Sequence, residues 1–206
     1  MISAIVLAAG ASSRMGTSKA TLMLAGRPLL SYVLQVVQQA HVDQIVLVLG
    51  ADADAARRRF PIVGITPVVN PDFAGGVSTS IRLGVRHLDQ DAAAFFVVLG
   101  DQPFVSPFTF DRLAVEWRTV PAKILVPSFR GQRGSPVLLD RSMVQEVDRL
   151  TGDEGFRSLF AAHPRDVRDV PVEDPGVVFD IDTPDQVRIA ERVLLHGERL
   201  VSFVLH

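Results

Sequence analysis

Apolar runs alternate with helical segments along most of this chain. The runs that are continuously apolar or β-branched, as in buried parallel strands, cover residues 4–8, 44–49, 66–69, 94–99 and 122–126. The segments that are typical of helices cover residues 28–40, 51–60, 78–88 and 108–117. This alternation predicts an α/β fold with three layers, in which a mainly parallel central sheet has helices on both faces.

The elements become shorter after Arg130. Strands are expected over 136–139, 167–172 and 177–181, and helices over 142–150, 154–162 and 185–195. Ser78 and Ser80 are candidate caps for helix 78–88, while Thr183 and Pro184 suit the start of the last helix. Residues 199–206 fit either an edge strand or a loose end. No repeat or flexible linker interrupts the chain, so we expect a single domain over residues 1–206.

The amino-acid composition of the chain excludes several classes of protein and site. The chain has 206 residues, 48% of them hydrophobic, and a net charge of −2, which indicates a filled core and gives no sign of a nucleic-acid partner. It has no cysteine, which excludes disulfides, thiolate metal sites and a cysteine nucleophile. No apolar run approaches the length of a membrane span. We therefore expect a cytoplasmic protein with no membrane partner.

The loop after the first apolar run is rich in small residues. The run stops at Gly10, and Arg14, Gly16 and Lys19 follow it. Glycines let backbone N–H groups approach phosphate oxygens, and the two cations would offset the phosphate charge. The spacing matches neither a P-loop nor a dinucleotide fingerprint. A phosphate cradle and an ordinary turn with exposed cations both remain open at this point.

Three carboxylates follow expected strands. Asp101 comes directly after the run 94–99 and a glycine. Asp180 and Asp182 lie at the end of the expected strand 177–181 and, because side chains alternate, on the same side of it. Mg²⁺ is bound in proteins by one or two carboxylates together with substrate phosphates, so these residues suit a magnesium site. The alternatives are that Asp101 caps the helix after Pro107, and that the other two carboxylates are simply solvated.

A fourth segment, residues 70–80, places Gly75 and Gly76 before a serine-rich helix start. Free N–H groups at such a start suit a polar ligand, although a plain turn into a helix would have the same composition. Ligands bind beyond the carboxyl ends of strands in open parallel sheets, and all four segments are expected at such ends. One shared site is therefore predicted.

Six motifs occur in order along the chain. They are L-A-A-G-x-S-x-R-M-G-x-x-K at 7–19, N-P-D-x-x-x-G at 70–76, G-D-x-P at 100–103, R-G-x-P at 133–136, G-D-x-G-x-R at 152–157 and D-I-D-T-P at 180–184. Together they resemble the molybdopterin nucleotidyltransferase (MobA-like NTP transferase) family, and within it the molybdenum cofactor cytidylyltransferase group. The resemblance implies a Rossmann-like nucleotidyltransferase fold.

The resemblance also implies roles for individual residues. Catalytic roles fall on Arg14, Lys19 and Asp101. The nucleotide would be bound by Leu7, Ala8, Ala9, Gly10, Ser12, Arg14, Gly16, Lys19, Asn70, Gly75, Ser80 and Asp101. The acceptor would be bound by Gly134, Ser135, Asp153 and Arg157. Mg²⁺ would be held by Asp101 and Asp182, with Asp180 as an alternate ligand.

The implied reaction transfers CMP from CTP to the terminal phosphate of molybdopterin and releases pyrophosphate. Ala8 and Ala9 before the first glycine favour CTP, whereas Ser135 departs from the histidine that relatives commonly carry. A phosphate monoester is largely ionised at pH 7, so no strong general base is required. A molybdenum hydroxylase is the implied client. The alternatives are GTP or another phosphorylated acceptor, a non-catalytic molybdopterin carrier, and a redox role on pigment-like substrates.

Overall fold

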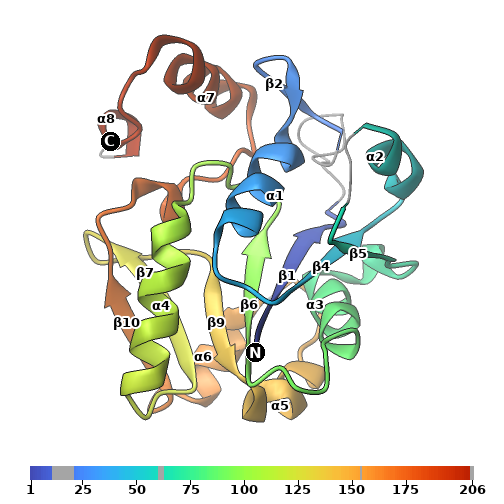
Figure 1. Cartoon of the computed structure of the whole chain (residues 1–206), viewed down its shortest axis with the longest axis vertical. Helices are drawn as coiled ribbons and strands as arrows, with labels where there is room; N and C mark the ends of the chain where they lie inside the picture. Colours follow the sequence, from blue (N-terminus) through green and yellow to red (C-terminus); the bar gives the residue numbers. More distant parts are fainter. Residues whose placement is uncertain (11–20, 60–62, 154, 205–206) are drawn as a thin grey trace.

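The computed structural model describes residues 1–10, 21–59, 63–153 and 155–204, and a twisted sheet runs through its centre (Figure 1). The strands of this sheet are β1 (Ile2–Ala8), β4 (Gln44–Leu49), β5 (Thr66–Val69), β6 (Ala94–Leu99), β7 (Ile124–Phe129), β8 (Gln132–Arg133), β9 (Val137–Asp140) and β10 (Val167–Pro171). Their order is β10-β7-β9-β6-β1-β4-β5, with β8 paired to β7. Strand β9 runs antiparallel to both its neighbours, while β6, β1, β4 and β5 are mutually parallel. The predicted mainly parallel α/β sheet is confirmed.

Helices cover both faces of the sheet. They are α1 (Leu29–Gln39), α2 (Ala53–Arg59), α3 (Val77–Arg86), α4 (Pro107–Thr119), α5 (Val144–Asp148), α6 (Phe156–Ala162), α7 (Pro184–His196) and α8 (Val201–Val204). Buried residues of α1, α2 and α4 pack on one face, and those of α3, α5 and α6 on the other. A short hairpin, β2 (Met23–Leu24) and β3 (Arg27–Pro28), lies near α7 and contributes to a third, smaller cluster (Figure 1). No helix in the described ranges is long and apolar enough to cross a membrane.

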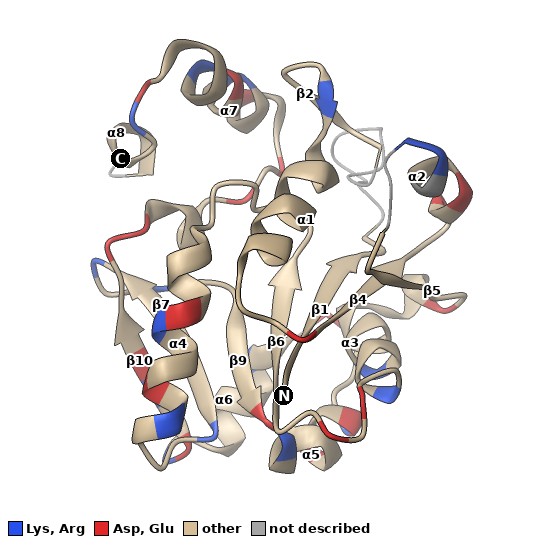
Figure 2. Cartoon of the chain, in the orientation of Figure 1, with Lys and Arg blue, Asp and Glu red and all other residues tan. Residues whose placement is uncertain are grey.

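The two sides of the core reflect the alternation of side chains along each strand. Side chains alternate between the two faces of β1, so Val6 packs with α1 and α4 while Ile5 packs with α3. Strands β1, β4 and β6 carry no charged residue, and Figure 2 shows the charges on the surrounding helices, loops and outer strand. On β6, Phe95 and Phe96 are fully buried on opposite faces. Burying each such side chain contributes about 1.5–3 kcal/mol.

The expected strand over 177–181 is wrong. Residues Pro175–Val178 form a 3-10 helix, η3, which is stabilised by the buried carboxylate of Asp174. That carboxylate accepts hydrogen bonds from the backbone of Gly176 at 3.0 Å and of Ser106 at 2.8 Å. These local hydrogen bonds compete with strand pairing, and the chain therefore leaves the sheet after β10.

The start of helix α3 and the end of the chain also differ from expectation. Helix α3 begins after Gly76, and Ser78 and Ser80 lie buried inside its first turns instead of capping it. Residues Val201–Val204 form the short helix α8, so this part of the end is neither an edge strand nor a loose coil. The start of α7 is confirmed, because Thr183 and Gln186 form a capping box with Pro184 in the first turn.

Candidate active site at the carboxyl edge of the sheet

The ends of parallel strands β1 and β6 border a hollow of about 360 Å³. Its lining includes Leu7, Ala8, Ala9 and Gly10 after β1, and Gly100 and Asp101 after β6. The Gly100 N–H donates to the carbonyl of Leu7 at 2.9 Å, which joins the two strand ends. Helix α3 adds Val77 and Ser80 from the other side. The structure thus brings together residues from three of the four segments at this edge.

Three carboxylates gather beside this hollow. The backbone N–H of Ile181 donates to the carbonyl of Asp101 at 3.0 Å, which holds the segment 180–182 against the end of β6. Burial raises the pKa of Asp180 to about 6, and a hydrogen bond with Asp182 and the charges of Asp182 and Asp101 add to this effect. The expected strand is absent, but the predicted proximity of these carboxylates holds.

The carboxylate cluster (Asp101, Asp180 and Asp182) fits a divalent cation. Like charges that raise a carboxyl pKa are relieved when a cation binds between them. In the described ranges, no group of three or more His, Asp or Glu side chains has an arrangement that would hold a metal by itself. A divalent cation bound by one or two of these carboxylates would complete its shell with phosphate oxygens and water.

The start of α7 positions Asp182. The side chain of Gln186 accepts hydrogen bonds from the backbone N–H groups of Asp182 at 2.9 Å and Thr183 at 2.8 Å. This capping box fixes the backbone on which Asp182 is carried. Ser106 caps helix α4 by accepting from the N–H of Phe108, so the alternative that Asp101 is the cap of that helix is excluded.

Asn70 supports the hollow from below. It is only 3% exposed, and its amide donates to Thr79 Oγ1 and Ser80 Oγ, each at 2.9 Å. Its carbonyl oxygen accepts from the N–H of Asp72 at 2.9 Å. These bonds hold the Asn70 side chain in place, and its assignment to the nucleotide stays a prediction. Its bond to Ser80 Oγ orients a side chain that borders the hollow.

The second glycine of the pair, Gly76, borders the hollow, whereas Gly75 is not part of its lining. Gly76 has a φ of +97°, and a Cβ there would lie 2.4 Å from the backbone of Gly152. Only glycine fits this position. The predicted nucleotide-binding residues include Gly75 but not Gly76, although Gly76 is the glycine that ends the N-P-D-x-x-x-G motif.

A larger cavity of about 780 Å³ adjoins the smaller hollow and shares Leu7, Val77 and Leu99 with it. Side chains of β6, β7 and β9 line it, and residues of α6 form another wall. Three of the four expected acceptor residues, Gly134, Ser135 and Arg157, border this cavity. Asp180 borders it as well, so the carboxylate cluster lies where the two spaces meet.

Asp153, the fourth expected acceptor residue, is separate from the other three. It borders the smaller hollow, and its Oδ1 accepts from the Val77 N–H at 3.0 Å. A carboxylate at the first N–H of a helix is favourable because of the helix dipole. Asp153 therefore caps the start of α3 at the border of the smaller hollow. No signal within residues 152–157 revealed this partner, because Val77 is 76 residues away.

The R-G-x-P motif has a steric explanation. A Cβ on Gly134 would lie 2.0 Å from the carbonyl oxygen of Val177. That same oxygen accepts from the Ser135 N–H at 2.9 Å, and the Gly134 N–H donates to the carbonyl of Pro127 at 2.8 Å. This side of the cavity is thus held to η3 and β7 through the backbone.

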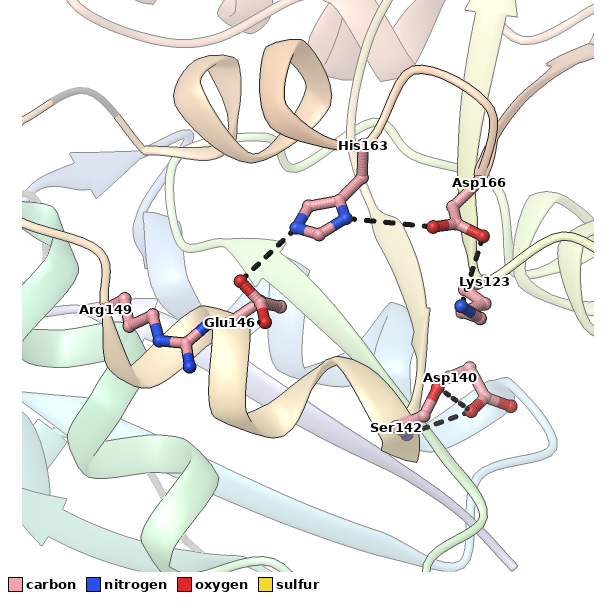
Figure 3. Close-up of polar contacts among 7 residues, drawn as sticks. All are labelled: Lys123, Asp140, Ser142, Glu146, Arg149, His163 and Asp166. Carbon is pink, nitrogen blue, oxygen red and sulfur yellow. Dashed lines mark hydrogen bonds and ion pairs between the residues drawn. The ribbon is translucent and has the colours of Figure 1, made fainter.

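Helix α6 is anchored through His163, which sequence reasoning missed (Figure 3). His163 Nε2 lies 3.3 Å from Glu146 Oε2 on α5, and Nδ1 lies 3.7 Å from Asp166 Oδ2. Asp166 also pairs with Lys123 at 3.3 Å. A hydrogen bond from Arg149 lowers the pKa of Glu146, and His163 adds to this effect. These contacts attach the cavity wall to α5 and to Lys123, the residue before β7, and none of these residues lies in a motif.

Ser12, Arg14, Gly16 and Lys19 lie outside the described residues. Their assigned roles stay predictions.

Known proteins with similar sequences match most of the length of this chain. Residues 4–167 match the model of the MobA-like NTP transferase domain. Nicotine blue oxidoreductase from Paenarthrobacter nicotinovorans is 30% identical over 90% of this chain and 94% of its own length. Molybdenum cofactor cytidylyltransferase from Escherichia coli K12 is 28% identical over 89% of this chain and 92% of its own.

Solved structures show the same fold. Rv0371c from Mycobacterium tuberculosis H37Rv superimposes with a TM-score of 0.82 at 31% identity, and the match covers 93% of this chain and 97% of that one. A complex of Rv0371c with manganese superimposes with a TM-score of 0.79, at 30% identity over 93% of this chain and 98% of that one.

Proposed function

The chain belongs to the MobA-like NTP transferase domain family and is a nucleotidyltransferase, and from this premise we propose that it transfers CMP from CTP to the terminal phosphate of a molybdopterin-type cofactor. The observation that carries the proposal is the pair of adjoining spaces that meet at the carboxylate cluster. A transfer between two bound substrates requires such a pair, with charge neutralisation where they meet.

The smaller hollow suits the nucleotide. Ala8, Ala9 and Gly10 border it, and Arg14 and Lys19 follow in the sequence. In this proposal the two cations neutralise the triphosphate, and the Ala-Ala pair favours cytosine. The larger cavity has an apolar floor and Arg157 on its lining, which suits a flat heterocycle that carries a phosphate.

Asp101 and Asp182 would hold Mg²⁺, with Asp180 as the alternate ligand, and the manganese complex of Rv0371c supports a divalent ion in this family. When bound, such an ion neutralises charge on the transferred and leaving phosphates. The residues of the chain align the acceptor phosphate with the α-phosphorus of CTP. The attacking phosphate is already ionised near pH 7, so no side chain needs to remove its proton.

One similarity favours a second candidate function. Nicotine blue oxidoreductase is as similar to this chain as the other relatives, and an apolar cavity also suits a flat pigment-like molecule. Oxidation or reduction of such a molecule would not require the carboxylate cluster. Transfer requires it, and this difference makes the two functions separable by experiment.

The test is pyrophosphate release. The protein is incubated with Mg²⁺, each of the four NTPs, and molybdopterin or another phosphorylated acceptor. Release that requires both CTP and molybdopterin supports the proposal; release with GTP or another acceptor supports the alternative substrates. Binding of molybdopterin without release supports a carrier that delivers the cofactor to a molybdenum hydroxylase client. Asp101→Asn should abolish release, whereas Asp148→Asn, which removes an exposed carboxylate on α5, should not.

A further inference from the structure

Gln102 is a buried amide at the border of the larger cavity. It is 6% exposed, and its Nε2 donates to the carbonyl of Val177 at 3.4 Å. Its Oε1 is buried and accepts no hydrogen bond from any described residue. A buried acceptor without a donor is unfavourable, so such an atom next to a cavity points to a ligand that supplies the donor.

The orientation of this amide is fixed by its neighbours. The Val177 carbonyl, which also accepts from the Ser135 N–H at 2.9 Å, must face the NH₂ group of Gln102 because two carbonyl oxygens would repel. Oε1 is therefore the amide atom that does not face the Val177 carbonyl. Because the NH₂ group of Gln102 already donates to Val177, the group that this side chain offers to a ligand is its acceptor oxygen.

The part of the cavity lining that α6 contributes offers flat apolar surface. Phe156 and Phe160, one turn apart on α6, have ring centroids 6.1 Å apart and an interplanar angle of 17°. Both rings border the cavity. Two aromatic rings in this arrangement favour a planar ligand ring that packs against them.

We propose that Gln102 determines ligand specificity in the larger cavity: its Oε1 accepts an N–H group from the edge of a flat heteroaromatic ring that packs against Phe156 and Phe160. This inference rests on the proposed function only in taking the cavity as the acceptor site. Because Gln102 directly follows Asp101, a ring held by Gln102 is also positioned relative to the carboxylate cluster. Gln102 is thus a positioning residue for the reacting phosphate.

The direct test is equilibrium binding without nucleotide or metal, read from ligand fluorescence. Pterin-6-carboxylate and 2-naphthoate are both flat bicyclic carboxylates, but only the pterin has N–H donors on its ring edge. The wild-type protein should prefer the pterin by roughly tenfold, the usual size of one buried hydrogen bond. Gln102→Leu should lose this preference because its affinity for the pterin falls while its affinity for 2-naphthoate is kept.

Gln132→Leu is the matched control, since Gln132 also borders the cavity but is exposed on β8. It should keep the wild-type preference. Gln102→Met, which has an unbranched side chain of similar length without an acceptor, repeats the test if the leucine variant unfolds. An unchanged preference in a folded Gln102 variant, or no preference in the wild type, would overturn the inference.

A transfer assay separates this inference from the proposed function. If transfer occurs, Gln102→Leu should raise the KM for the acceptor about tenfold while the KM for CTP stays unchanged. An equal rise in both constants would overturn the positioning role. If the wild type releases no pyrophosphate but the pterin preference depends on Gln102, the proposed function fails and the inference stands.

Discussion

Replacing Asp180 by asparagine should stabilise the metal-free protein at neutral pH. The pKa of Asp180 is raised from 3.8 to about 6, so the folded state favours the protonated side chain, which asparagine resembles. A raised pKa contributes stability below about pH 4, and this contribution is lost as the pH rises through about 6. At pH 7.5 the charged carboxylate therefore opposes folding.

The size of the effect follows from the shift. About two pKa units correspond to about 3 kcal/mol at about 1.36 kcal/mol per unit, and solvent screening of this partly exposed group reduces the figure to about 1 kcal/mol. For a chain of this length, 1 kcal/mol raises the Tm by about 2–4 °C. We expect this rise for Asp180→Asn at pH 7.5 in EDTA, and no rise at pH 4.

Thermal unfolding monitored by circular dichroism at both pH values measures the difference. Mg²⁺ should raise the Tm of the wild type more than that of Asp180→Asn, because the variant has lost one repelling carboxylate that the cation relieves. Asp148→Asn controls for the loss of any exposed carboxylate. A lower Tm for Asp180→Asn in EDTA at pH 7.5, or the same rise at pH 4, would refute the reasoning.

Two further predictions concern the cavity and the loop. Gly134→Ala should lower the free energy of unfolding by about 2 kcal/mol, because its Cβ meets the Val177 carbonyl oxygen, and chemical denaturation measures this. Gly10→Ala, where a Cβ meets no described atom within 4 Å, should stay near wild type; equal losses would contradict the steric argument. Lys19→Ala should reduce kcat, and Lys19→Arg should restore it only in part, since a compact ammonium differs from a planar guanidinium. Full activity of the arginine variant would remove this interpretation of Lys19.

The sheet was predictable because its central strands are buried on both faces. A run such as Ala94–Leu99 is continuously apolar, and no other element of that length and composition competes with a parallel strand. The start of α7 was predictable for a similar reason, since Thr183 and Pro184 act locally. The residues that form such local patterns are neighbours in the sequence, so the pattern can be recognised without knowledge of distant contacts.

Contacts between distant segments were not predictable. The strand expected over 177–181 fails because Asp174 forms bonds with Gly176 nearby and with Ser106, which lies 68 residues away. Asp153 caps α3 across a similar separation. The carboxylate cluster was anticipated only because parallel strand ends meet at one edge, and its local geometry depends on the Ile181–Asp101 hydrogen bond.

Transfer of CMP can be followed with CTP that is labelled at its α-phosphate. The wild-type protein is incubated with the labelled CTP, Mg²⁺ and molybdopterin, and the products are separated by chromatography. We predict that the label moves into a molybdopterin–cytosine dinucleotide, and that Asp101→Asn lowers this transfer by orders of magnitude. Label that stays in CTP, or that appears only in free CMP, would contradict the transfer of CMP to molybdopterin by this protein.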